Sequence, residues 1–343
     1  MAHKPVAVLI SDVHYNVHTL PLADAAMRQA IAKANDLNIP LIIAGDLHDT
    51  KANLRGECVK AMIETFKLSK TDCYVLVGNH DKINEKSEDH SLTFLEAYCN
   101  VIQEPHFSPS TKSYLLPYYH DVAQLKIALS FIPKGSRIIM HQGVEGSNMG
   151  DYVQDKSALQ KDDLADYRVI SGHYHARQDI KCGRPRAGAI GLFSYIGNPY
   201  TLGFGEAADP GKGFRLLMED GTLEFIPTNL ARHQIVICGW DDRHELFWGP
   251  ILALKAVDKV WFKVKGTSEQ LAKVTKQWIT KELQLKPDFD FKLELIPEIV
   301  ETEKTSVNLF SAGETLDIMI DSLSNTSLER KEKLKQLWRN SCN

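Results

Sequence analysis

Five short apolar runs of this sequence each end directly in a cluster of polar residues, and this feature constrains the fold most. Among them are Val6–Ile10, Pro40–Ala44 and Tyr74–Val77, whose continuous apolar character is typical of strands buried on both faces. Between the first two, residues from about Leu22 to Leu37 place apolar side chains at helical spacing. This alternation of strands and helices predicts a layered α/β fold with the sheet inside.

The polar clusters that follow these runs are rich in histidine, aspartate and asparagine. In chain order they are Ser11-Asp12-Val13-His14, Gly45-Asp46-Leu47-His48-Asp49, Gly78-Asn79-His80-Asp81, His141 and Ser171-Gly172-His173-Tyr174-His175. In open α/β sheets, the loops at the carboxyl ends of the strands converge over one edge. We therefore expect these side chains to meet in one crevice.

Carboxylate, imidazole and one neutral amide together form a ligand set for borderline divalent metals, and there are enough ligands for two ions. Two ions about 3.5–4 Å apart form a recurrent clamp for in-line attack on phosphorus. Such a pair needs a bridging carboxylate, and Asp46 is the candidate because it is central in chain order and follows a strand. His141 alone could be a surface or core histidine and Asp12-Val13-His14 alone an ordinary turn, whereas Gly78-Asn79-His80-Asp81 is rare by chance. The joint occurrence of all five clusters favours a metal site.

Composition removes several classes of protein. The net charge of −4, from 40 basic and 44 acidic residues, excludes a uniformly basic nucleic-acid coat. No apolar run approaches the roughly 18–20 residues that span a bilayer, and the N-terminus passes into a strand-like run without a signal cleavage site. The six cysteines are scattered, which is typical of a reducing compartment. We expect a soluble cytoplasmic protein without membrane contact.

The chain divides into three regions of different texture. We expect a core over residues 1–230, a small β-α-β lobe over 231–300 and a linker with a helical tail over 301–343. The core is expected to close with a hairpin within 204–227, the lobe to contain one helix over Ser268–Leu283, and the tail to form helices over Glu314–Leu323 and Ser327–Trp338.

The polar clusters resemble the motifs of the calcineurin-like metallophosphoesterases in residue type, order and approximate spacing. The matching stretches are Asp12-x-His14, Gly45-Asp46-x-x-Asp49, Gly78-Asn79-His80-Asp81, His141 and Gly172-His173-x-His175. The resemblance covers half of the chain, and its motifs are highly specific. It implies a layered metallophosphoesterase core, a β-sandwich flanked by helices, with a small α+β capping lobe and C-terminal helices.

The resemblance also implies a role for each polar residue. The metal ligands would be Asp12, His14 and His175 at the first ion and Asn79, His141 and His173 at the second. Asp46 would bridge the two ions. His80 would lie outside the coordination sphere, as proton donor to the leaving oxygen or as transition-state stabiliser, and Asp81 would orient it. The neutral amide of Asn79 limits negative charge where a phosphate must bind.

Several features resemble the SbcD-type nuclease subunit of SbcCD complexes, in a compact phage or bacterial form. Protein phosphatases of this superfamily usually carry Asp-Arg-Gly at the second motif and Gly-Asn-His-Glu at the third, whereas this chain has Asp49-Thr50-Lys51 and Gly-Asn-His-Asp. Tyr195-Ile196-Gly197-Asn198-Pro199 and Phe204-Gly205-Glu206 resemble the nuclease family. The first motif departs from its usual Asp-Trp-His-Leu-Gly.

This resemblance implies a manganese-dependent DNA exonuclease or endonuclease that works in repair, recombination or replication. The open alternative is a stand-alone metallophosphatase or cyclic-nucleotide phosphodiesterase. The implied partners are DNA, an SMC-like ATPase subunit of the SbcC type on the C-terminal helices, and a second copy of the chain through 59–68 and 92–98. The C-terminal helices could instead pack on the core. A DNA-binding patch of Arg177, Lys181, Arg184 and Arg186 has a solvated loop as its alternative, and a phage-encoded chain would act in the host cytoplasm.

Overall fold

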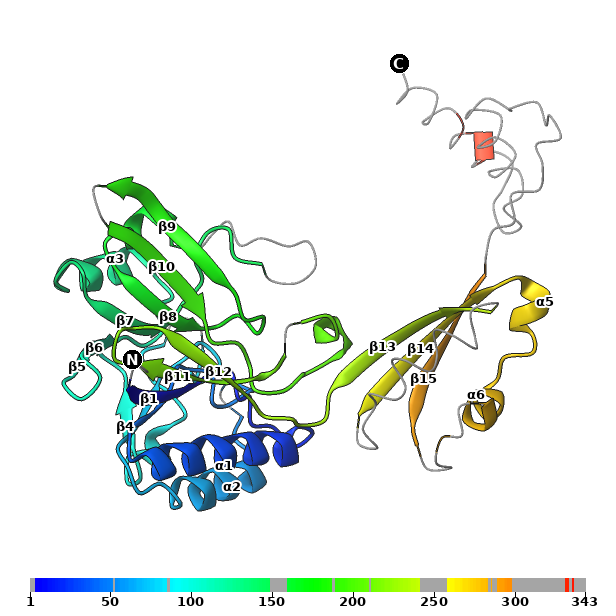
Figure 1. Ribbon diagram of the computed structural model, residues 1–343, viewed down its shortest axis with the longest axis horizontal. Coiled ribbons are helices and arrows are strands. Elements are labelled where there is room, and N and C mark those ends of the chain that lie inside the picture. Colours follow the sequence, from blue (N-terminus) through cyan, green and yellow to red (C-terminus); the bar gives the residue numbers. More distant parts are fainter. Residues whose placement is uncertain are drawn as a thin grey trace.

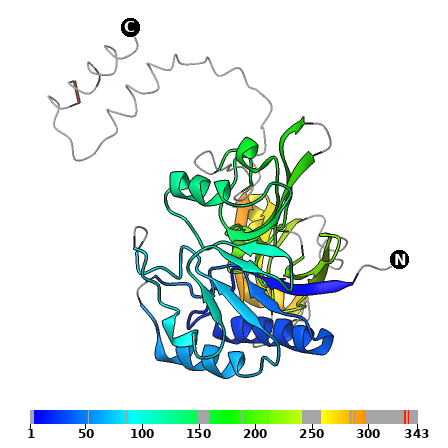
Figure 2. The same ribbon diagram turned by 90° about the vertical axis from the view of Figure 1, so that its left-hand side faces the viewer.

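The computed structural model describes residues 4–51, 53–84, 87–148, 159–186, 189–209, 211–240, 258–282, 285, 289–297, 331, 332 and 335. The core contains two six-stranded sheets, and a three-stranded sheet forms a small lobe beside it (Figure 1). Helices cover the outer faces of the two core sheets (Figure 2). The predicted fold class, a layered sandwich flanked by helices, is confirmed.

The first core sheet has the strand order β12-β11-β1-β2-β3-β4. Its strands are β1 (Pro5–Ile10), β2 (Leu41–Ile43), β3 (Cys73–Leu76), β4 (Asn100–Ile102), β11 (Gly213–Met218) and β12 (Leu223–Pro227). The four N-terminal strands are parallel, and β11 pairs antiparallel with β1. All carboxyl ends of the parallel strands therefore lie at one edge of this sheet.

Two helices cover the outer face of the first sheet, α1 (Leu20–Leu37) and α2 (Gly56–Phe66). The buried side of α1 is its predicted apolar stripe, which includes Ala26, Ala30 and Ile31. The helix ends at Asn38, whose φ of 52° lets its N–H reach the last carbonyls of the helix.

The second core sheet has the strand order β5-β6-β7-β8-β10-β9. Its strands are β5 (His106–Ser108), β6 (Ser113–Leu115), β7 (Arg137–His141), β8 (Arg168–Gly172), β9 (Asp179–Arg186) and β10 (Ala189–Tyr195). Its outer face carries α3 (Val122–Ser130), which the Asp121 side chain caps by accepting a hydrogen bond of 2.8 Å from Ala123 N.

The interior between the two sheets is apolar. Leu9 and Ile42 from the first sheet pack with Leu115, Ile139 and Ile170 from the second, and all five are buried. Burying each such side chain contributes about 1.5–3 kcal/mol. This packing holds the carboxyl ends of β1, β2 and β3 against those of β7 and β8, so the site forms between two sheets rather than over one.

The small lobe contains the parallel strands β13 (His233–Gly239), β14 (Lys259–Gly266) and β15 (Phe291–Pro297). The single helix predicted over Ser268–Leu283 is wrong, because the structure has two helices, α5 (Ser268–Leu271) and α6 (Lys276–Glu282). Between them the Thr275 hydroxyl accepts a hydrogen bond of 3.0 Å from Trp278 N and so caps a new helix.

The predicted hairpin within 204–227 is shorter than expected, since only β11 and β12 form it. Phe204–Glu206 is instead a 3₁₀ turn, η3. The two predicted tail helices lie outside the described residues, apart from residues 331, 332 and 335. None of the described helices combines the length and apolar composition that a bilayer crossing requires.

Candidate metal site

The backbone turns sharply where β1, β2 and β8 end. Asp12, His14, Asp46 and His173 have φ values of 53°, 50°, 50° and 92°, a region that residues other than glycine rarely occupy. Such conformations persist where the surrounding structure enforces them, and they cluster at functional sites. Gly172 precedes His173 because a Cβ there would collide with Ser11 and the Ala44 carbonyl.

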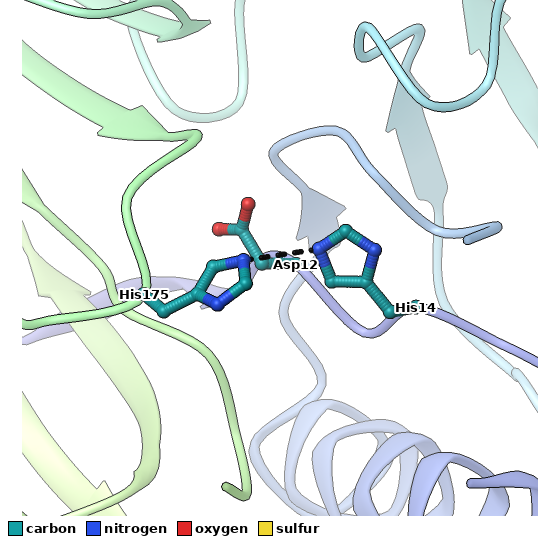
Figure 3. Close-up of side chains that lie close together, drawn as sticks. All are labelled: Asp12, His14 and His175. Atoms are coloured by element: carbon teal, nitrogen blue, oxygen red, sulfur yellow. Dashed lines mark hydrogen bonds between the residues drawn. The ribbon is translucent and has the colours of Figure 1, made fainter. Parts of the chain in front are cut away.

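The first ligand group consists of Asp12, His14 and His175 (Figure 3). Their potential ligand atoms all lie within 4.8 Å of one another, and the facing Nε2 atoms of His14 and His175 are 3.1 Å apart. Asp12 is fully buried, and the His173 backbone N–H donates to its carboxylate at 3.0 Å. Residues 161 positions apart in the sequence thus converge between the two sheets.

The second ligand group consists of Asp46, His141, His173 and Asn79. The ligand atoms of the first three lie within 4.8 Å, and Asn79 Oδ1 lies 3.0 Å from His141 Nε2 and 2.9 Å from His173 Nδ1. Asp46 Oδ2 is 3.2 Å from His141 Nε2 and 3.9 Å from His14 Nε2. Asp46 therefore lies between the two groups, where a bridging carboxylate is needed.

The donor set fits divalent cations. His141 Nδ1 donates to the Ala44 carbonyl at 2.7 Å, and His175 Nδ1 is 2.6 Å from Glu206 Oε1. A hydrogen bond on one ring nitrogen directs the lone pair of the other nitrogen toward the remaining ligands of its group, as is usual for metal-binding histidines. Mixed nitrogen and oxygen donors suit manganese, iron or zinc better than calcium.

The charges of the second group are strongly coupled. Burial alone would lower the pKa of His141, but the Asp46 carboxylate raises it to about 9. Burial acts to raise the pKa of Asp46, yet His141 and His14 hold it well below its usual range. Without a cation, the group is thus a buried carboxylate beside an imidazolium, and a bound cation would replace that proton.

His80 lies at the edge of the first group and is partly exposed. Its ring meets that of His14 edge to face, with centroids 4.9 Å apart, and its Nδ1 donates to the Asp49 carbonyl at 2.6 Å. One of its ring nitrogens is also within 4.8 Å of ligand atoms of His14 and Asp46. Its role as proton donor rather than ligand stays a prediction.

The structure gives Asp81 a role different from the predicted one. Its buried carboxylate accepts hydrogen bonds from Gly78 N at 2.8 Å and His48 N at 2.9 Å, so it ties together the loops after β3 and β2. Burial and nearby Asp46 raise its pKa to about 6. The orientation of His80 comes from the Asp49 carbonyl, not from Asp81.

Two carboxylates were missed as site residues. Asp49 Oδ1 is 3.2 Å from His14 Nδ1, and Glu206 contacts His175 from another loop. Asp49 belongs to the second motif and Glu206 to the Phe204-Gly205-Glu206 stretch, so both lay in recognised motifs. Their pairing with histidines depends on the tertiary fold, which spacing alone does not give.

The predicted basic patch is only partly described. The Arg177 guanidinium lies 3.7 Å from the Phe225 ring centroid at the edge of the first sheet, and Lys181 is exposed on β9. Arg184 and Arg186 lie in β9, but their side chains are outside the described part of the chain. DNA binding by these four residues stays a prediction.

Known proteins resemble this chain at the level of family. Comparison with curated proteins gave no match. One solved structure, "Structural and Functional Characterization of a Novel Archaeal Phosphodiesterase", shares 16% identity over 64% of this chain and 98% of that chain, with a TM-score of 0.34, which is too low to carry an argument. The sequence model of the calcineurin-like phosphoesterases matches residues 6–177, half of the chain and all of its ligand clusters. The chain therefore belongs to the calcineurin-like phosphoesterase family.

Proposed function

We propose that this chain is a manganese-dependent DNA nuclease that hydrolyses phosphodiester bonds at a two-metal site. Membership of the family supports metal-dependent phosphoester hydrolysis. The two ligand groups that adjoin at Asp46 support a pair of cations rather than one. The observation that carries the choice of DNA over a small phosphoester is a basic, aromatic face on the small lobe.

Alternate residues of β14 point to opposite faces of the lobe. Val260 and Phe262 pack against α5 and α6. The opposite face, called the lysine face below, carries Lys259, Trp261, Lys263, Lys265 and, from β15, Lys292. It also carries one acidic residue, Glu294, whose carboxylate is 3.3 Å from Lys263 Nζ. The ammonium groups of Lys263 and Lys292 lie 4.1 Å and 3.6 Å from the Trp261 ring centroid.

Trp261 of the lysine face contacts the core close to the first ligand group. Phe204 of η3 packs against Trp261 with ring centroids 5.5 Å apart, and Glu206 of the same turn contacts His175. A strand of nucleic acid could therefore contact the lysine face and the ligand groups together, with ammonium groups at its phosphates. A small phosphoester would use the ligand groups alone.

The chain's own residues account for the remaining parts of the reaction. Bound cations would neutralise charge on the phosphate and generate a nucleophile from water at neutral pH. His80, held through Nδ1 by the Asp49 carbonyl, presents its other nitrogen to the site and donates a proton to the departing sugar oxygen. Asn79 contributes an oxygen ligand without adding a charge that would repel the substrate.

A charge reversal on the lysine face tests this function. With Mn²⁺, Lys263→Glu combined with Lys292→Glu should lower cleavage of linear DNA by about tenfold or more, because two phosphate contacts become repulsive. Hydrolysis of bis(4-nitrophenyl) phosphate should be unchanged. Lys273→Glu combined with Lys281→Glu, an equal double reversal at exposed positions beside α5 and on α6, is the matched control and should leave both rates unchanged.

Three results would contradict the proposal. Equal loss of both activities would place the effect in the metal site, and an unchanged rate on DNA would show that the lysine face does not bind the substrate. Hydrolysis of small esters without cleavage of DNA by the unaltered chain would favour a stand-alone metallophosphatase or cyclic-nucleotide phosphodiesterase. Family membership supports that alternative equally well.

The proposal includes an assembly. An SMC-like ATPase subunit would bind the helical tail within 301–343, and the complex would process DNA ends in the cytoplasm. The net charge of −4 favours a role for a partner, because a chain of negative net charge binds the DNA backbone weakly on its own. Copurification with an ATPase encoded beside this chain, lost when 301–343 is deleted, is the expected outcome.

A further inference from the structure

One segment of the core, Asn198–Glu206, contacts the first ligand group and the small lobe. It follows β10 and ends in the η3 turn. Within it, Glu206 contacts the ligand group, whereas Thr201 and Phe204 contact the lobe. These contacts connect the segment to the metal site, although none of the five ligand clusters includes it.

Glu206 holds His175 in a fixed orientation. Its Oε1 is 2.6 Å from His175 Nδ1, while Oε2 accepts hydrogen bonds of 3.0 Å from both Asn198 Nδ2 and Leu202 N and lies 3.2 Å from Lys212 Nζ. Both carboxylate oxygens of Glu206 are thus engaged, one of them by His175, so Glu206 can fix the tautomer of His175.

The same segment is anchored in the small lobe. The Phe204 ring lies 4.9 Å from the His233 ring and 5.5 Å from the Trp261 ring, both edge to face. The Thr201 hydroxyl accepts a hydrogen bond of 2.7 Å from His233 N and lies 3.0 Å from His233 Nδ1. Aromatic pairs of this kind contribute beyond their buried area, so the lobe helps to fix the position of η3.

We propose that Glu206 is a positioning residue for His175 and that Phe204 makes the small lobe part of the same metal site. This inference rests on the proposed metal-dependent function. Glu206 keeps the Nε2 lone pair of His175 directed at the first ligand group. Phe204 lies two residues before Glu206 and packs on Trp261 of the lobe. A shift of the lobe would therefore move Glu206 and change the direction of the His175 lone pair. DNA on the lysine face would thus act on metal binding.

Isothermal titration calorimetry of the metal-free full chain with MnCl₂ tests the role of Glu206. We expect two binding events in the unaltered chain, and His141→Asn identifies the event of the second group. Glu206→Gln keeps the size of the side chain but removes its charge, and should weaken the other event by about tenfold or more. The event at Asp46, Asn79, His141 and His173 should be unchanged.

Phe204→Ala should weaken Mn²⁺ binding at the first ligand group alone. Phe204→Tyr should bind Mn²⁺ as the unaltered chain does, because the aromatic contacts remain. Glu57→Gln and Phe107→Ala are matched controls at exposed positions far from the ligand groups and should bind as the unaltered chain does. Thermal unfolding of every variant shows whether it is folded. Phe204→Leu, which keeps apolar bulk, replaces the alanine variant if that variant unfolds.

Equal weakening of both events by Glu206→Gln, or no weakening, would overturn its positioning role, since a general loosening of the fold affects both groups. Normal binding by folded Phe204 variants would overturn the link to the lobe. Two normal Mn²⁺ events in an unaltered chain that cleaves no DNA would defeat the nuclease proposal alone. The two proposals therefore fail by different results.

Discussion

At the scale of single residues, His141 carries a proton that a bound cation would displace. It is fully buried, its Nε2 faces Asp46 at 3.2 Å, and its Nδ1 is held by the Ala44 carbonyl. Below its pKa of about 9, the metal-free protein carries a second ring proton on this imidazole, at Nε2. Histidine binds a metal as neutral imidazole, so this second proton has to leave when a cation binds.

We therefore predict that Mn²⁺ binding at neutral pH releases protons and that its affinity rises with pH until the pKa of His141 is reached. The sign follows from the raised pKa, because fewer protons remain to be displaced as the pH approaches about 9. Calorimetry in buffers of different ionisation enthalpy measures the release. His120→Ala, at an exposed position, should behave as the unaltered chain. Heats that do not depend on the buffer would contradict the prediction.

His80 permits a second residue-scale prediction. Its Nδ1 is occupied by the Asp49 carbonyl, so removing the ring should delete a proton donor and leave the ligands in place. We expect His80→Ala to lower kcat by about 10²–10⁴-fold with both Mn²⁺ events retained. Paired kinetics and calorimetry provide the measurement. Loss of one binding event would show that His80 is a ligand, which its proximity to His14 and Asp46 allows.

At the scale of elements, the strands were predictable and their partners were not. Runs such as Val6–Ile10 form buried strands because a continuous apolar segment is removed from water only when both faces of the strand are covered. The prediction that the polar clusters gather at strand ends follows from their position directly after these runs in the sequence. The pairing of β7 and β8 in a second sheet depends on contacts between distant segments, so the site lies between sheets rather than above one.

Short elements and site contacts were the least predictable. The helix expected over Ser268–Leu283 is interrupted because the Thr275 hydroxyl caps a new helix, a local competition that apolar spacing does not reveal. Asp81 was linked to its neighbour His80, whereas its partners are the backbone N–H groups of Gly78 and His48. Sequence proximity thus indicates which residues belong to the site, and the fold decides what each contacts.

At the scale of the whole molecule, burial narrows the residues that can form the interface of the predicted homodimer. The segments proposed to pair, 59–68 and 92–98, lie side by side, with Lys67 Nζ 5.5 Å from the Tyr98 ring centroid. Met62 and Leu95 are fully buried in the core, so neither can contact a second copy. Leu68 and Tyr98 are 43% and 37% exposed and can do so.

We predict that the chain has the mass of a dimer in light scattering and that Leu68→Glu combined with Tyr98→Glu gives a monomer, because two carboxylates would be buried without partners. The thermal unfolding temperature of each protomer should change little, since both side chains are partly exposed in a single chain and neither belongs to the buried core. Phe131→Glu, at an 81% exposed position on the other sheet's side, is the matched control and should remain dimeric. A monomeric unaltered chain, or a double variant of unchanged mass, would contradict this interface.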